Sequence, residues 1–426
     1  MGKATFSDPN FYLVSDSFQY TIRGEMQLEE EIDGKLLEAA VQTAFQRYPY
    51  FSVQLICEDN EYLLVPNDRP HNILHTNEQI TIGSSDVNYH LFVISYYGKS
   101  VFFNVSHCIT DGTGRAPLAK TILYYYLTAK YQIDLDTEGI NLAGSELFPD
   151  ETGLPLPEAE FLSAESTFYT PVFNAFRLSD HPSVSDQKRV EYRFSVKESE
   201  LMAVCRSIGA SPASIASAWL AEIAWEQNPD TDQNIIVDMC VNMRPGLNNQ
   251  HSYMRLLSCI PMTYAPEQRS LDLAGLTKTT RSMIKSQSQP ENIRYLYKQS
   301  YKVVNKILKM KSLSMKQKIM DACIRGPEGF LSSTFIESYV GRNNLGSLSP
   351  YIKAVFTTVD AIPTGGAMLE ITSANDQLFF AFMQDFSSDV YLNALIRKIE
   401  QSGISVSRLG KGPVKAPRIQ MPEALL

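Results

Sequence analysis

The chain lacks the features that mark secreted, membrane-spanning and disulfide-rich proteins. Its six cysteines include no Cys-x-x-Cys pair, which favours reduced and mostly buried thiols over a disulfide framework. No apolar run approaches the roughly 20 residues that a membrane-spanning helix needs. The first residues, Met-Gly-Lys-Ala-Thr-Phe, lack the charged-then-apolar order of a signal peptide. We therefore expect a cytoplasmic protein without a transmembrane segment.

Positive charge is also scarce, because 38 Lys and Arg stand against 47 Asp and Glu, which gives a net charge of −9. This balance argues against nucleic acid as a general partner. The sequence contains no Gly-rich phosphate loop. His71 and His75 have the four-residue spacing of helical metal ligands, but no third ligand is spaced with them, so no metal site is predicted.

The chain does have the length and the apolar content for more than one core. Its 426 residues exceed the size at which a single core keeps growing, and 44% of them are apolar. Segments with strand and helix periodicity alternate in both halves, which predicts an α/β or α+β fold with mixed sheets. The clearest predicted helices cover 36–46, 114–131, 213–227 and 389–401, and the clearest strands 18–22, 52–57, 62–66, 89–97, 101–105, 189–195, 234–241, 352–359, 368–373 and 378–384.

One segment, Asn104-Val-Ser-His107-Cys-Ile-Thr-Asp111-Gly112, has the composition of a reactive site. His107 follows the apolar run 101–105 at the exit of a predicted strand, and the chain then turns through Asp111-Gly112 into a helix. Histidine is the side chain best suited to accept a proton near neutral pH, and a strand-to-helix junction is a fixed support for it. From the residues alone two interpretations remain open: a general base, or a half-buried histidine of a β–α turn.

This segment resembles the His-x-x-x-Asp-Gly motif of the acyltransferases related to chloramphenicol acetyltransferase. That superfamily includes the condensation domains of peptide synthetases, the plant acyl-CoA-dependent acyltransferases and the alcohol acetyltransferases. Further resemblances follow in order along the chain: the predicted helix before Arg47-Tyr-Pro49, the segment 241–245 that contains Asn242 and Arg244, and the segment 334–341 before Leu345-Gly346.

Two departures narrow the comparison within the superfamily. Condensation domains usually carry two adjacent histidines, whereas Ser106 precedes His107 here. The Asp-Phe-Gly-Trp-Gly segment of the plant enzymes is absent. The chain therefore looks most similar to a free-standing alcohol or amine acetyltransferase-like member.

The resemblance implies two chloramphenicol acetyltransferase-like lobes with a tunnel at their interface. We expect an N-terminal lobe over residues 1–160, a crossover linker over 161–189, a C-terminal lobe over 190–410 and a loose tail over 411–426. It also implies that an acyl group, such as acetyl, passes directly from an acyl-CoA co-substrate to a small-molecule hydroxyl or amine. No acyl-enzyme and no permanently bound cofactor are expected.

The resemblance also implies roles for individual residues. His107 and Asp111 would be the catalytic pair of the motif, with His107 as general base, Asp111 holding the turn at Gly112, and Arg244 as the best candidate for the ion-pair partner of Asp111. The alternative for Arg244 is a surface loop residue next to Pro245-Gly246. Cys108 is expected to pack rather than to act as a nucleophile, because sequence neighbours at a strand end point in different directions. A donor for the oxyanion is not identified; the candidates are Ser258, Thr263 and Ser333.

A basic stretch stands out in this acidic chain, with no acid between Glu291 and Asp321. Its cations are Arg294, Lys298, Lys302, Lys306, Lys309, Lys311, Lys316 and Lys318. We predict that Lys302, Lys306 and Lys309 bind the phosphates of coenzyme A. A solvated lysine face, a contact with an acidic acyl carrier protein and an interfacial helix are the alternatives. A competing function for the whole chain is a non-catalytic, condensation-like binding module.

Overall fold

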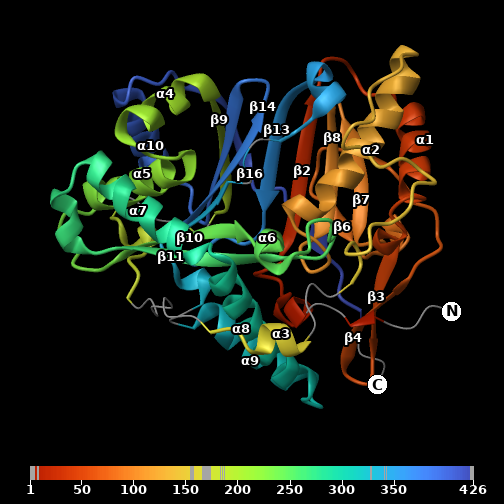
Figure 1. Ribbon diagram of the computed structural model, residues 1–426, viewed down its shortest axis with the longest axis horizontal. Coiled ribbons are helices and arrows are strands. Elements are labelled where there is room, and N and C mark those ends of the chain that lie inside the picture. The colour runs from red at the N-terminus through yellow and green to blue at the C-terminus, as the bar shows by residue number, and fades with distance from the viewer. Residues whose placement is uncertain are drawn as a thin grey trace.

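Two β-sheets stand next to each other in the computed structural model, with helices on their outer sides and below them (Figure 1). The structure describes residues 5–6, 9–153, 158–165, 174–182, 184, 186, 188–326, 329–339, 341 and 343–422. Within these residues, no helix combines the length and the apolar content needed to cross a bilayer. The predicted fold class, mixed α/β with mixed sheets, is confirmed, because parallel and antiparallel neighbours occur in the same sheet.

The first sheet is built mainly from the N-terminal part of the chain. Its strands, in spatial order, are β13 (Ile352–Val359), β2 (Thr21–Leu28), β8 (Ser100–Ser106), β7 (Phe92–Tyr97) and β5 (Leu74–His75). Helices α1 (Gly34–Phe45) and α2 (Gly112–Tyr131) cover its outer side (Figure 1). Smaller sheets adjoin it: β1 (Thr5–Phe6), β4 (Glu61–Pro66) and β3 (Val53–Glu58), and the pair β17 (Arg418–Ile419) and β6 (Thr81–Ile82).

The second sheet is built from the rest of the chain. Its seven strands, in spatial order, are β11 (Leu257–Tyr264), β10 (Ile235–Asn242), β12 (Phe335–Tyr339), β14 (Ala367–Ala374), β15 (Gln377–Gln384), β9 (Val190–Lys197) and β16 (Ser407–Pro413). Its outer side is covered by α4 (Glu198–Ile208), α5 (Pro212–Gln227), α7 (Leu273–Gln287) and α10 (Val390–Gln401) (Figure 1). The second core lies between this sheet and these helices and contains the fully buried Trp219.

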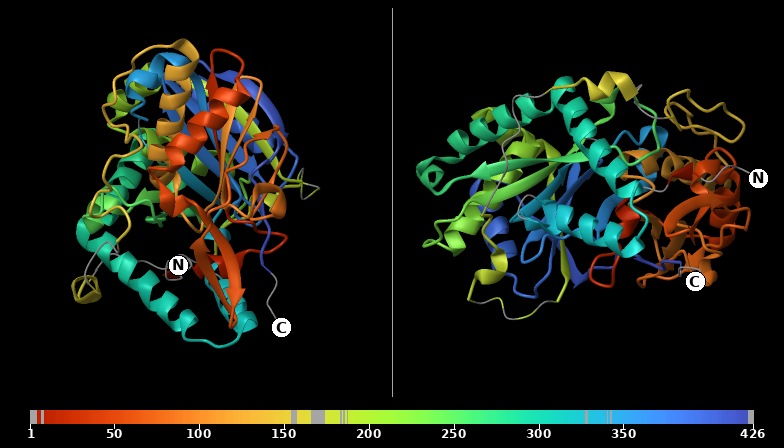
Figure 2. Two further views of the ribbon diagram at one scale, coloured as in Figure 1. Left: turned by 90° about the vertical axis from the view of Figure 1, so that its right-hand side faces the viewer. Right: turned by 90° about the horizontal axis from the view of Figure 1, so that it is seen from below.

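The α-helices in the rest of the described residues are α3 (Glu158–Leu162), α6 (Arg244–Leu247), α8 (Pro290–Leu308) and α9 (Leu313–Arg325). The last two lie below both sheets in Figure 1, and the right-hand view of Figure 2 shows them on the underside of the molecule. Capping explains where several helices begin. Asp33 accepts hydrogen bonds from Lys35 N and Leu36 N at the start of α1, and Ser211 and Ser214 form a capping box at the start of α5.

Strand β13 shows that the two sheets do not correspond to two consecutive parts of the sequence. It comes from the predicted C-terminal lobe, yet it pairs with β2 along the register Thr357↔Gly24 to Val359↔Ile22 and forms the edge of the first sheet. It then leads directly into β14 of the second sheet. The first sheet is therefore complete only when a segment from the last quarter of the chain has joined it.

Two expectations from the sequence need correction. Strand β2 covers 21–28 rather than 18–22, because its polar positions find partners inside the fold, such as Arg23 with Asn77. The tail is not loose over its described part. Residues 407–413 pair with β9, Ile419 lies opposite Ile82, and Ala416 is buried. Within the predicted linker 161–189, residues 166–173, 183, 185 and 187 lie outside the described residues.

Candidate functional site

His107 occupies the first position after β8, where its backbone and side chain are both held. Its backbone N–H donates to Tyr20 O at 2.9 Å, and its ring stacks on the Tyr20 ring with centroids 4.8 Å apart. Nδ1 lies 2.9 Å from Thr110 O. A carbonyl oxygen only accepts, so Nδ1 carries the proton and Nε2 keeps its lone pair. This is the tautomer that a general base acting through Nε2 needs.

Burial of His107 has a direct electrostatic consequence. Burial, reinforced by the nearby charge of Arg255, lowers the pKa of His107 to about 4, against which the hydrogen bond to Thr110 O acts only in part. The side chain is therefore neutral at neutral pH. A neutral imidazole can accept a proton without first losing one.

Asp111 joins the two halves of the chain through Arg244. Asp111 Oδ1 caps α2 by accepting from Gly114 N at 2.8 Å, and it also accepts from Arg244 Nη2 at 2.9 Å. Oδ2 accepts from Arg244 Nη1 at 3.0 Å and from Leu256 N at 2.8 Å. The ion pair that the sequence suggested is thus present, and both side chains are almost fully buried.

Arg244 uses all five of its N–H donors. Besides Asp111, its guanidinium donates to Ser252 O, Asn242 Oδ1 and Met254 O at 3.0, 3.2 and 2.6 Å. A buried guanidinium with every donor paired is rigid, because any movement leaves a charged donor without an acceptor. The pair therefore fixes the turn after His107 against the end of β10, which is a structural contribution.

The glycines of the turn have different surroundings. A Cβ on Gly112 would meet no atom within 4 Å, and Gly112 lines the cavity described below. A Cβ on Gly114 would lie 2.3 Å from Tyr253 O and 2.5 Å from Thr110 Oγ1. Gly114, rather than Gly112, is therefore the position where close backbone packing requires glycine.

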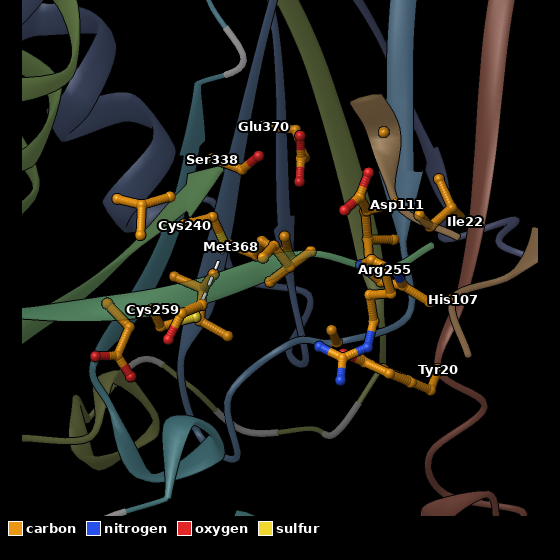
Figure 3. Close-up of a pocket in the computed structure, with 18 of the residues that line it drawn as sticks. Tyr20, Ile22, His107, Asp111, Cys240, Arg255, Cys259, Ser338, Met368 and Glu370 are labelled. Carbon is orange, nitrogen blue, oxygen red and sulfur yellow. Dashed lines mark hydrogen bonds between the residues drawn. The ribbon is translucent and has the colours of Figure 1, made fainter. Parts of the chain in front are cut away.

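A cavity of about 610 Å³ lies next to His107 between the two sheets. Strands β2 and β13 of the first sheet and β10, β11, β12 and β14 of the second all contribute to its wall, together with the start of α2 and parts of α8 and α9. Figure 3 shows His107, Asp111 and Tyr20 on one side and Cys240, Ser338 and Glu370 on the other. The cavity is large enough for a small-molecule ligand.

Several polar residues of this wall were not assigned from the sequence. Arg255 lies beside His107 (Figure 3). Asp238 on β10 and Glu370 on β14 line the opposite side, and burial raises their pKa values to about 7 and about 8. Arg115 lines the cavity one helical turn after Asp111. Asp238 and Glu370 could have been identified as charged residues inside apolar strands, and Arg115 as a charged residue on the apolar face of a helix. No such signal marks Arg255.

Other predicted residues have clear positions. Cys108 is buried in the first core and does not line the cavity, and the Ser106 hydroxyl accepts a hydrogen bond from Cys108 N. Of the candidates for an oxyanion donor, Ser258 and Ser333 line the cavity, whereas Thr263 does not.

The lysines predicted to bind phosphate lie beside the cavity rather than in its wall. Lys302, Lys306 and Lys309 are exposed at the C-terminal end of α8. The same helix contributes Gln299, Ser300, Val303 and Val304 to the cavity, whose described lining includes none of the three lysines. Other cations of the stretch are held by the protein: Lys298 donates to Ala164 O at 2.5 Å, and buried Lys316 lies 3.1 Å from Glu61 Oε1.

His71 and His75 do not meet as ligands of one metal ion. The His71 ring is buried between Phe45 and His90, and burial lowers its pKa to about 3, whereas His75 stacks on Tyr96. Over the described part of the chain, no group of three or more His, Cys, Asp or Glu side chains is arranged to hold a metal ion.

Comparisons with known proteins find similarity of fold without similarity of sequence. No family model and no curated protein matches the chain. Its structure is similar to that of TRI101 from F. graminearum in complex with coenzyme A and T-2 mycotoxin, with a TM-score of 0.61 and 11% identity over 96% of this chain and 100% of that one.

Two other solved structures are similar over most of the chain. Polyketide synthase associated protein 5 from Mycobacterium tuberculosis has a TM-score of 0.60 and 15% identity over 89% of this chain and 92% of that chain. A mutant starter condensation domain of rhizomide synthetase, in complex with C8-CoA, has a TM-score of 0.59 and 12% identity over 93% of each chain. The fold that the motif resemblance implied, that of chloramphenicol acetyltransferase-like and condensation-domain proteins, is thereby confirmed.

Proposed function

We propose that this protein transfers an acyl group from an acyl-CoA thioester directly to a hydroxyl or amine of a small molecule, with His107 as general base. Nε2 of His107 accepts the proton of the acceptor's hydroxyl or amine, while the oxygen or nitrogen of that group attacks the thioester carbonyl carbon. The tetrahedral intermediate then collapses, the C–S bond breaks, and the imidazolium returns the proton to the leaving sulfur. The products are the acylated acceptor and free coenzyme A.

The observation that carries this proposal is the state of His107. A neutral imidazole, with Nδ1 committed to Thr110 O, presents Nε2 at a cavity formed by both sheets. Asp111 contributes by fixing the turn through Arg244 rather than by contacting the imidazole. Ser258 is the candidate donor to the oxyanion, because it lines the same cavity and lies on β11.

The similar structures support the choice of donor and acceptor. TRI101 was solved with coenzyme A and T-2 mycotoxin, and the starter condensation domain with C8-CoA. We assign Lys302, Lys306 and Lys309 to the approach of the donor phosphates, since they lie at the C-terminal end of α8, next to residues of the same helix that line the cavity. A donor bound to an acyl carrier protein is the alternative form of this proposal.

The test is a screen of the purified chain with acetyl-, butyryl- and octanoyl-CoA against pooled alcohols and amines. Thiol release measures turnover, and mass spectrometry identifies the acylated acceptor. We expect stoichiometric thiol and acylated product from at least one pool. If none of these donors releases thiol, the screen is repeated with the same acyl groups on an acyl carrier protein. Ligand binding in the cavity without thiol release in either screen supports the competing function of a non-catalytic binding module.

A further inference from the structure

Arg115 is a second buried charge at the start of α2, and a glycine makes room for it. It follows Asp111 by one turn, and its side chain is only 7% exposed. A Cβ on Gly24 would lie 2.0 Å from Arg115 Nη1 and 2.6 Å from Cζ. The guanidinium thus occupies the place that the side chain of residue 24 would fill, in the middle of β2. Any larger residue there would displace it from the cavity wall.

The protein satisfies Arg115 far less completely than Arg244. Among the described residues its side chain makes one hydrogen bond, from Nη2 to Thr357 Oγ1 at 3.2 Å, and Nε has no partner. Thr357 lies directly opposite Gly24 in the pairing of β13 with β2. Both Arg115 and Thr357 line the cavity. Most donors of this guanidinium are therefore available to a ligand.

Glu370 completes the surroundings of Arg115 from the second sheet. Thr372 Oγ1 donates to Val355 O, so β14 lies against β13, and Glu370 is near enough to Arg115 for their charges to interact. Glu370 lines the cavity and is almost fully buried. Burial raises its pKa to about 8, which leaves much of it protonated and able to donate at neutral pH.

The charges in this corner of the cavity do not balance. Asp111 is committed to Arg244, and a protonated Glu370 does not neutralise Arg115. A buried charge without a counter-charge is unfavourable, and an anionic ligand relieves it. The planar fork of a guanidinium matches a carboxylate in particular.

We propose that Arg115, Thr357 and Glu370 form a subsite for a carboxylate carried by one of the two substrates. This inference rests on the proposed acyl transfer and names the class of its substrate. The carboxylate belongs either to the acceptor, as in a hydroxy or amino acid, or to the far end of the acyl group, as in a dicarboxylic acyl-CoA. Both sources present the same group to the same side chains.

Two assays of the wild-type protein distinguish these sources. The first compares succinyl-CoA with butyryl-CoA, a neutral donor of equal chain length. The second uses acetyl-CoA and compares hydroxy and amino carboxylic acids with their carboxamides. We expect kcat/KM to favour the carboxylate in one assay by about 10- to 100-fold, the range for a charged hydrogen-bonded contact. Preference in the first assay assigns the carboxylate to the acyl group, and preference in the second assigns it to the acceptor.

Variants test the residues. Arg115→Met should remove that preference by lowering the carboxylate-to-neutral ratio of kcat/KM by the same 10- to 100-fold, and Arg115→Lys should restore part of it. The matched control is Arg23→Met, which removes a buried guanidinium from the same strand as Gly24 but outside the cavity lining, and should leave the ratio unchanged. If Arg115→Met does not fold, Gly24→Ala displaces the guanidinium and should also lower the ratio.

The outcomes separate this inference from the proposed function. Transfer to neutral substrates with no carboxylate preference in either assay refutes the subsite and leaves acyl transfer standing. If no donor is turned over, acyl transfer fails, and calorimetry with succinyl-CoA, butyryl-CoA and succinate decides the subsite alone. Weaker binding of succinyl-CoA or succinate to Arg115→Met than to wild type then supports it, and equal binding overturns it.

Discussion

Replacing Asp111 by Asn removes the charge of the central ion pair while nearly preserving its shape. Asn remains a good N-cap residue, so its Oδ1 still accepts from Gly114 N. The amide nitrogen, however, would face Arg244 Nη1 and Leu256 N, two donors that now bond to Oδ2 at 3.0 and 2.8 Å. Arg244 would then be a buried charge without its counter-charge. Breaking such a pair costs about 3–5 kcal/mol.

The expected stability change is measurable by calorimetry. A chain of 426 residues has an unfolding entropy of about 0.9 kcal/mol/K at roughly 2.1 cal/mol/K per residue, so the penalty lowers Tm by about 3–6 °C if the chain melts as one unit. Acyl transfer should fall together with Tm, because the turn that carries His107 loosens. The double variant Asp111→Asn, Arg244→Met should regain part of the stability, since no orphan charge remains.

The control is Asp272→Asn at the exposed N-cap of α7, where Asp272 Oδ1 accepts from Gly275 N at 2.8 Å. It keeps the capping hydrogen bond and should change Tm by less than about 1 °C. An inactive Asp111→Asn protein with unchanged melting would refute the structural role and assign Asp111 to the chemistry itself. Unchanged activity and unchanged melting would show that the Asp111–Arg244 pair contributes neither to stability nor to catalysis.

The remaining predictions concern His107 and the lysines of α8. His107→Ala should lower kcat by about 10²- to 10⁴-fold with the fold intact, as monitored by circular dichroism; wild-type turnover contradicts the assignment. The acid limb of kcat/KM should lie near pH 4 rather than 6.5, because burial and Arg255 lower the pKa of His107. In the unfolded chain this histidine takes up a proton below about pH 6.5, so its stabilising contribution is complete above that pH and falls by up to about 3 kcal/mol towards pH 4. The melting temperatures of wild type and His107→Ala at pH 5 and 7.5 measure this pH-dependent contribution to stability. An acid limb of kcat/KM at pH 6.5 refutes the low pKa of His107. Changing Lys302, Lys306 and Lys309 to Glu should raise the donor KM, with a salt dependence that the variant loses, and should leave the acceptor KM nearly unchanged. A control triple reversal of exposed Lys35, Lys99 and Lys197 should have no such effect; equal effects mean that only net charge matters.

The sequence predicts the scaffold around His107 well because the scaffold depends on local signals. Asp33 and Ser211 cap α1 and α5, which begin close to the predicted helices 36–46 and 213–227, and the apolar runs before His107 and in 352–359 form strands. The Asp111–Arg244 contact was suggested by a motif resemblance. The full set of hydrogen-bond partners of Arg244 includes backbone carbonyls such as Ser252 O, and no pattern of side chains in the sequence reveals these.

The rest of the site depends on which strands become neighbours, and periodicity does not specify that. Glu370 and Arg115 are 255 positions apart, and only the pairing of β13 with β2 and the position of β14 beside β13 bring them to one cavity. The tail was misjudged for a related reason: short strands such as β17 are stabilised by a partner already in place, here β6, rather than by their own sequence.

The position of β13 has a consequence for the synthesis of the chain. Strand β2 pairs with β8 as soon as residues 100–106 are available, but its other edge waits for residues 352–359. At about 5–20 residues per second, the ribosome needs about 12–49 s to add the segment 107–351 between these two strands. Throughout that time the nascent first sheet presents an open strand edge, which is a template for pairing with other chains. Cellular yield of this protein should therefore depend on holdase chaperones that cover β2 until translation reaches β13.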